Sequence, residues 1–223
     1  MNARAMHMEF ERKVGQFSQP DFPMPFLSHE VEDFLNESQD IKVKNLYVDF
    51  EQNEKARTEL GPLINNVVIT TFVTGAAYCH TNGHMANVPT GVQYPVKESC
   101  NVVYSDCNDN TGTKEVKVMP ITHDEYLANI DNPYRKPYID LIWRIDMGAS
   151  GTSYKRHELV TDGSVSITNY MLRYIKRPTA ISIINNTTCE LDPSVHDDIV
   201  DLAASIALKT RPQLQETKQN NES

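Results

Sequence analysis

The chain has 223 residues, of which 39% are hydrophobic and 23% charged, and its formal net charge is −9. This composition is that of a globular protein, with enough residues for one large domain or two small ones. No apolar run reaches the roughly 20 residues of a membrane-spanning helix, and the first residues lack the apolar core of a signal peptide. We therefore expect no membrane contact, and a protein located inside a cell or in a particle assembled there.

The first sixty residues predict helices separated by an extended arm. Residues 2–17 carry apolar side chains at three- and four-residue spacing, which is typical of an amphipathic helix. The members of this stripe are Ala3, Met6, Phe10, Val14 and Phe17. The prolines of residues 18–26 favour an extended arm. A second helix is predicted from an N-cap at Ser28 to about Phe50, and a third over residues 53–64.

The middle of the chain predicts mostly β-structure. Residues 65–73 are β-branched and apolar, which indicates a buried strand. Residues 75–115 are rich in Gly, Asn, Thr and Pro, and we interpret them as loops and short edge strands. Thr122 is a candidate cap for a short helix. Further strands are predicted at 115–122, 139–147, 154–162, 170–178 and 180–184, with a hairpin turn at 148–153.

The stretch YMLRYIKRPTAI at 170–181 is unusually basic and aromatic for an acidic chain. Its alternation directs Tyr170, Leu172 and Tyr174 to one side of a strand and Arg173 to the other. Because Pro178 cannot donate a hydrogen bond within a sheet, we expect the strand to end there or to lie at an edge.

The last helix has a clear beginning. Asp192 is a favourable N-cap, and Pro193 follows at the first helical position, where its missing N–H has no cost. The helix is predicted to end at Arg211, before Pro212. The tail beyond has almost no apolar residue to bury and is expected to be disordered when the protein is alone.

These elements predict an α+β fold, in which N-terminal and C-terminal helices pack as a small bundle around or against an inserted antiparallel β-rich region. We expect a single domain over residues 1–223. Its parts are an N-terminal helix and Pro-rich arm (1–27), a helical part (28–74), a β-rich part (75–190), a C-terminal helix (191–211) and an extended tail (212–223).

Motifs for catalysis or cofactor binding are weak. The stretch GASGTS at 148–153 lacks the lysine of a phosphate-binding loop and favours a hairpin turn. A zinc site could be assembled from Cys79, His80, His84, Cys100 and Cys107, but the tight paired spacing of zinc motifs is missing, and free thiols are the simpler reading. We predict no catalytic residue, cofactor or metal.

Several stretches together resemble the head-to-tail connector proteins of crAss-like tailed bacteriophages. They are MNARAM, FLNESQD, NPYRKPY, LVTDGSVSITNYMLRYIKRPTAISI and CELDPSVHDDIVDLAASIAL. The resemblance implies a non-enzymatic virion protein that is assembled in the cytoplasm of the host bacterium. It implies a closed ring of identical copies, usually twelve, below the portal protein. The ring would extend the DNA channel, join the capsid to the tail, contact the portal and neighbouring ring proteins, and pass genomic double-stranded DNA without specific binding.

A ring interface requires two complementary patches on each copy. We predict that basic residues and their aromatic neighbours form one of them: Tyr170, Arg173, Tyr174, Lys176, Arg177, Arg135 and Lys136. Arg211 and Leu214 are predicted to dock the tail on a partner. The alternative is a nucleic-acid-binding module that uses the basic and aromatic strand at 170–178, although an acidic chain is poorly suited to binding phosphate. An unrecognised hydrolase, based only on scattered His and Asp residues, is the third reading.

Overall fold

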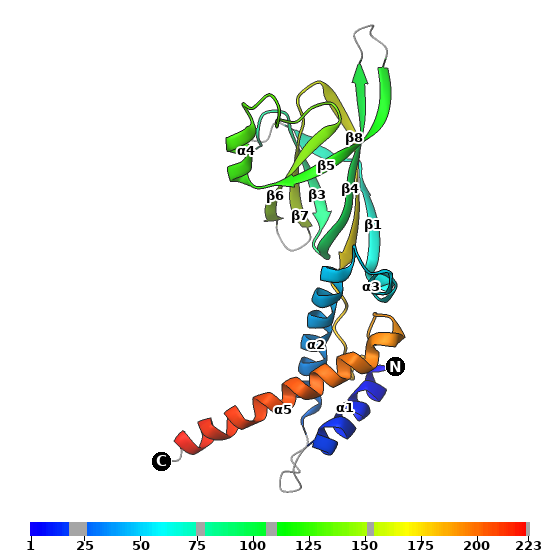
Figure 1. The fold of residues 1–223 in the computed structure, drawn as a ribbon, viewed down its shortest axis with the longest axis vertical. Coiled ribbons are helices and arrows are strands. Elements are labelled where there is room, and N and C mark those ends of the chain that lie inside the picture. Colours follow the sequence, from blue (N-terminus) through cyan, green and yellow to red (C-terminus); the bar gives the residue numbers. More distant parts are fainter. Residues whose placement is uncertain (18–25, 75–78, 106–110, 151–153, 222–223) are drawn as a thin grey trace. The chain divides into compact units, whose positions relative to one another are not determined.

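The computed structural model describes residues 1–17, 26–74, 79–105, 111–150 and 154–221, with side chains omitted for 16–17, 149–150 and 211–221. The chain divides into two compact units (Figure 1). Residues 1–63 and 178–223 form a helical unit, and residues 64–177 form a sheet unit. The α+β class predicted from the sequence is confirmed, with the β-rich region inserted between the terminal helices. No helix in the described part of the chain is long and apolar enough to cross a membrane.

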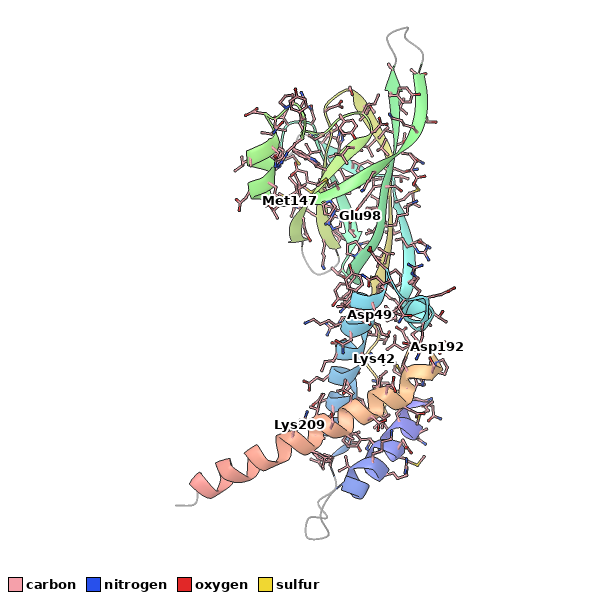
Figure 2. The ribbon with its side chains drawn as sticks, viewed as in Figure 1. Lys42, Asp49, Glu98, Met147, Asp192 and Lys209 are labelled. Atoms are coloured by element: carbon pink, nitrogen blue, oxygen red, sulfur yellow. The ribbon has the colours of Figure 1, made fainter. Side chains whose placement is uncertain are left out.

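The helical unit contains α1 (Ala3–Phe17), α2 (Ser28–Asp49), α3 (Glu54–Leu60), the 3₁₀ turns η1 (Gly61–Leu63) and η2 (Pro193–Val195), and α5 (His196–Asn221). The apolar stripe predicted for α1 is buried at Ala3, Met6, Phe10 and Val14. It packs against α5 and α2, and ion pairs join the same helices: Lys13 Nζ lies 2.6 Å from Asp201, and Lys42 Nζ 2.7 Å from Asp198. Lys42 is labelled in Figure 2.

The N-cap of α2 lies one residue before the predicted one. Leu27 has the extended cap conformation, and its N–H donates to Glu30 Oε2 over 2.8 Å. Ser28 is the first helical residue instead of the N-cap. The carboxylate at the third helical position satisfies a backbone donor that the helix leaves open, so the serine hydroxyl is not required for this role.

The C-terminal helix begins as predicted and continues further. Asp192 Oδ1 accepts a hydrogen bond from Ser194 N over 2.9 Å, with Pro193 at the first position of η2. The backbone of α5 continues to Asn221, so residues 212–221 are helical and not the extended tail expected from Pro212. The φ angle of proline is compatible with a helix, and residues 213–221 are mostly strong helix formers such as Gln, Leu, Glu and Lys.

Residues 180–184 do not form the last strand that their alternation predicts. The side chain of Asn36 on α2 bonds both backbone groups of Ile181, accepting from its N–H over 2.7 Å and donating to its carbonyl over 3.1 Å. Gln39 donates to Thr179 O over 3.1 Å, and Glu32 accepts from Ile183 N over 2.5 Å. Polar side chains of a helix therefore occupy the backbone groups that a neighbouring strand would need.

The sheet unit is one curled mixed sheet with the strand order β1-β8-β4-β5-β6-β7-β3-β2. The strands are β1 (Ile64–Ile69), β2 (Phe72–Thr74), β3 (Gly83–Pro89), β4 (Val92–Ser105), β5 (Thr111–Ile121), β6 (Leu141–Ser150), β7 (Tyr154–Val160) and β8 (Val165–Lys176). Neighbours are antiparallel except β5 and β6. That parallel pair is possible because residues 122–140, which include α4 (His123–Asn129), form a long crossover. Thr122 caps α4 as predicted, since its hydroxyl accepts from Glu125 N over 3.2 Å.

Two predictions for the β-rich part were wrong. Residues 75–115 contain the long strands β3 and β4 and the beginning of β5, in the interior of the sheet, and not loops with short edge strands. Residues 64–69 form an edge strand whose residues 65, 66 and 68 are exposed, and not a buried strand. The irregular pairing of β4 around Pro95 makes β4 hard to recognise in the sequence. Cys100 and Val102 are nevertheless both buried, as the alternation of a strand predicts.

Candidate assembly surface

The basic and aromatic strand β8 lies inside the sheet, between β1 and β4, and not at its edge. It spans Val165–Lys176, so it begins five residues before the predicted strand and ends two residues before Pro178. The predicted inner face is confirmed: Tyr170, Leu172 and Tyr174 are 0%, 1% and 7% exposed and belong to the main core of the sheet. Both tyrosines are therefore unavailable to a partner, although they were among the predicted interface residues.

The inner face of β8 carries a buried polar network that the sequence did not predict. The hydroxyl of Tyr170 donates to Glu98 Oε2 over 2.8 Å, and His157 Nδ1 lies 3.0 Å from the same hydroxyl. Arg144 Nε lies 2.9 Å from Glu98 Oε2, but its N–H is not directed at the carboxylate, so the contact is ionic and not a hydrogen bond. Figure 2 labels Glu98 among the strands of the sheet unit. With Glu98 ionised, the single hydroxyl hydrogen of Tyr170 points to it, and His157 must donate through Nδ1–H.

Burial controls the protonation of this network. It raises the pKa of the Glu98 carboxyl, and the neighbouring Arg144 guanidinium opposes that rise. Desolvation also raises the pKa of Tyr170 and of the Cys100 thiol. It lowers the pKa of His157 to about 4, with the positive charge of Arg144 acting in the same direction. The network therefore keeps His157 neutral in the folded protein at neutral pH.

We expect the folded protein to lose stability as pH falls from about 6.5 to about 4. His157 has a pKa of about 4 when folded, against an ordinary value of 6.5, so the unfolded chain binds its proton first. The contribution of His157 is fully present above pH 6.5 and falls by about 3 kcal/mol by pH 4. Urea unfolding of wild type and His157→Gln at several pH values measures it. The two free energies of unfolding should converge as pH falls, whereas parallel curves would rule out the assignment to His157.

The outer face of β8 presents Arg173. Its side chain is exposed, and its Cα partners are Asn66 on β1 and Lys97 on β4. Lys97 Nζ lies 3.2 Å from Glu115, whereas Arg173 has no ion pair among the described residues. Like charges on adjacent strands destabilise a sheet. Arg173 is therefore an exposed cation with no carboxylate partner in the described part of its own chain.

The other predicted residues lie at three different places. Arg177 is exposed just after β8, and its N–H donates to Gly91 O over 3.0 Å, while Lys176 is half-buried. Arg135 and Lys136 are exposed in the crossover between α4 and β6. Arg211 and Leu214 lie in the distal part of α5, where side chains are outside the description. The structure thus separates the predicted basic residues into patches and does not join them into one groove.

The histidines and cysteines do not gather into a metal site in the part of the chain that the structure describes. Cys100 is buried in the core of the sheet. His80 is instead bound to Glu158, a fully buried carboxylate that accepts from its backbone N over 2.5 Å and lies 2.7 Å from its ring Nδ1. Cys107 lies outside the described residues.

The net charge is distributed unequally between the two units. The sheet unit has eleven Lys and Arg and eleven Asp and Glu, whereas the helical unit has ten and nineteen, so the whole net charge of −9 belongs to the helical unit. Both basic patches with described side chains, around Arg173 and at Arg135 and Lys136, lie in the sheet unit. The basic side chains predicted for the ring interface therefore lie in a unit without net charge, and the acidic surplus lies in the other unit.

Comparison with known proteins agrees with a structural protein of a bacteriophage. Residues 24–220 match the family described as phage tail ring protein 3/4. The chain belongs to this family.

Two curated relatives come from Bacteroides phage crAss001. The chain is 26% identical to Ring protein 3 over 211 residues, which cover 86% of this chain and 88% of the relative. It is 28% identical to Ring protein 4/5 over 121 residues, which cover 48% of this chain and 49% of that relative. The resemblance to ring proteins of crAss-like phages found in the sequence is thereby confirmed.

Proposed function

We propose that this protein forms a closed ring, expected to be a dodecamer, in the head-to-tail connector of a crAss-like phage. The ring lies below the portal, extends the DNA channel and links the capsid to the tail. Its partners are further copies of itself, the portal and neighbouring ring proteins. The observation that carries this proposal is the family match over residues 24–220, with a ring protein of crAss001 aligned over most of both chains.

The charge of the chain supports passage of DNA without specific binding. A surplus of acidic residues repels phosphate, so DNA moving through the ring would meet few adhesive sites. The alternative, a nucleic-acid-binding module that uses the strand at 170–178, relies on the tyrosine rings of that strand as surfaces on which bases can stack. Tyr170 and Tyr174 are buried and cannot serve in this way. No enzymatic activity is proposed. The virion is the expected location, with assembly in the cytoplasm of the host bacterium.

Electron microscopy of the purified protein, alone and mixed with the portal, tests the proposal. We expect closed rings with a central channel that stack on the portal along a common axis. A monomer that never closes into rings, or an open filament, would contradict it. A monomer with tight, salt-sensitive affinity for DNA would favour the nucleic-acid-binding alternative.

Deleting residues 212–223 is expected to weaken docking and to leave the fold intact. Leu214 is the single large apolar residue of this stretch, so the free energy of unfolding should change by less than about 2 kcal/mol. We propose that Arg211 and Leu214 hold the end of α5 on an adjoining virion protein. Co-sedimentation with the portal or the neighbouring ring measures docking, and Leu214→Ser is the smaller matched change. Equal recovery of the complex with and without the tail would show that the tail is not an attachment arm.

A further inference from the structure

The most exposed large side chain with apolar character in the described residues is Tyr134, at 95% exposure. It lies in the crossover from α4 to β6, in a turn formed by residues 132–137, called here the Tyr134 turn. Because the Tyr134 ring is almost wholly exposed, packing within its own chain does not explain why a large aromatic side chain lies at this position. Tyrosine is enriched at the centres of protein interfaces, because it combines a large apolar ring with a polar tip.

The Tyr134 turn is held in one conformation by local bonds. Asn132 O accepts from the N–H groups of Arg135 and Lys136 over 3.1 and 3.0 Å, and Asn132 Oδ1 accepts from Tyr134 N over 3.0 Å. Pro133 and the buried Pro137 restrict the backbone on both sides of the tyrosine. A side chain presented on a preorganised turn loses little conformational entropy when it binds, which favours a role in recognition.

The chemistry of the turn selects an acidic partner. Arg135 and Lys136 are exposed, and neither has an ion pair among the described residues. Two exposed apolar side chains belong to the same crossover, Leu127 at 71% and Tyr138 at 53% exposure. A matching surface would therefore offer carboxylates beside some apolar contact area, since rims of interfaces are polar and their centres apolar.

The outward face of α2 offers such carboxylates. Asp33 and Glu37 are exposed four residues apart, on the side opposite the buried Val31 and Leu35, and neither has an ion pair in the described part of the chain. Like charges at this spacing destabilise a helix slightly, and a basic partner removes the repulsion. The helical unit, which contains α2, also carries the whole net charge of −9.

We propose that the Tyr134 turn of one copy docks on the Asp33–Glu37 face of α2 in the next copy of this chain. The proposal rests on the ring function and specifies one of its contacts. Two different surfaces meet at such an interface, so the contact is heterologous and repeats from copy to copy around a ring.

Charge reversal on each side gives a direct test. Arg135→Glu with Lys136→Glu, and separately Asp33→Lys with Glu37→Lys, should each raise the protein concentration needed for half-assembly by roughly tenfold or more. Tyr134→Ala should act in the same direction. Arg4→Glu, an exposed charge reversal on α1, is the control and should assemble as wild type. Circular dichroism checks that every variant is folded, and native mass spectrometry counts the copies.

Mixing the two reversed proteins separates this contact from others. In a ring in which they alternate, every Tyr134 turn again faces a helix of opposite charge, so the mixture should regain rings that contain equal numbers of both proteins. If wild type forms rings and both variants assemble as well as the control, the inference is wrong while the ring function stands. Rings that close normally but no longer bind another virion protein would also overturn it. Wild type that remains monomeric at every concentration would refute the ring function and this contact together.

Discussion

Arg144→Met should reduce the free energy of unfolding by about 3–5 kcal/mol, because it leaves the Glu98 carboxylate without its buried partner. Glu98 and Arg144 side chains are 8% and 11% exposed, and they lie on β4 and β6. The methionine keeps most of the apolar contacts of the arginine stem, so the loss reflects the charge more than the volume. Urea unfolding at neutral pH measures it.

The pH dependence of the same variant gives a second expected result. Burial already raises the pKa of Glu98, and removal of Arg144 raises it further. A carboxyl whose pKa is higher in the folded state gives up its proton more readily when unfolded. The folded variant should therefore lose stability as pH rises from about 4.5 through the raised pKa.

Two further variants complete this test. Adding Glu98→Gln to Arg144→Met should recover part of the loss, because no uncompensated charge then remains in the core. Lys97→Met, which breaks the exposed pair between Lys97 on β4 and Glu115 on β5, should cost only about 0–1 kcal/mol. A single variant Arg144→Met as stable as Lys97→Met would show that the buried contact contributes no net charge stabilisation.

Arg173→Ala should reduce ring formation while the monomer remains folded. The side chain is exposed on the outer face of β8, so its removal leaves the core of the sheet unchanged. A carboxylate of a neighbouring copy is the partner we propose, and an arginine can bind it through two hydrogen bonds at once. If the pair is buried in the interface, Arg173→Ala should weaken the association free energy by about 3–5 kcal/mol at each contact. For an exposed pair the loss should be about 0–1 kcal/mol.

Repetition makes this variant informative, because every interface of a ring loses the same contact. Native mass spectrometry over a range of concentrations measures the assembled fraction. Arg173→Lys tests the bidentate geometry, since lysine keeps the charge and loses the planar pair of donors. Exchanging Arg173 with its carboxylate partner should restore rings in part. Full-size rings of Arg173→Ala at wild-type concentrations would show that the outer face of β8 is not an assembly contact.

Local features of this protein were predictable from the sequence, because they depend on residues within one or two helical turns. The apolar stripe of α1, the cap of α4 at Thr122 and the start of the last helix at Asp192 are all of this kind. The alternation of β8 likewise identified Tyr170, Leu172 and Tyr174 as an inner face. The resemblance of several short stretches to a phage family then supplied the class of protein, which the composition alone does not contain.

Only the tertiary structure showed which residues contact each face of a strand and which groups hydrogen-bond to the backbone outside the sheet. Arg173 lies beside Lys97, and Tyr170 bonds Glu98, only because β8 pairs with β4, a strand that the sequence did not predict. Residues 180–184 have the pattern of a strand but lie along α2, whose Asn36 binds their backbone. Strand pairing and side-chain clamps of this kind join residues far apart in the chain. The energies of these contacts depend on which elements pack together in the folded chain. The residue pattern of a short segment does not specify its partner element.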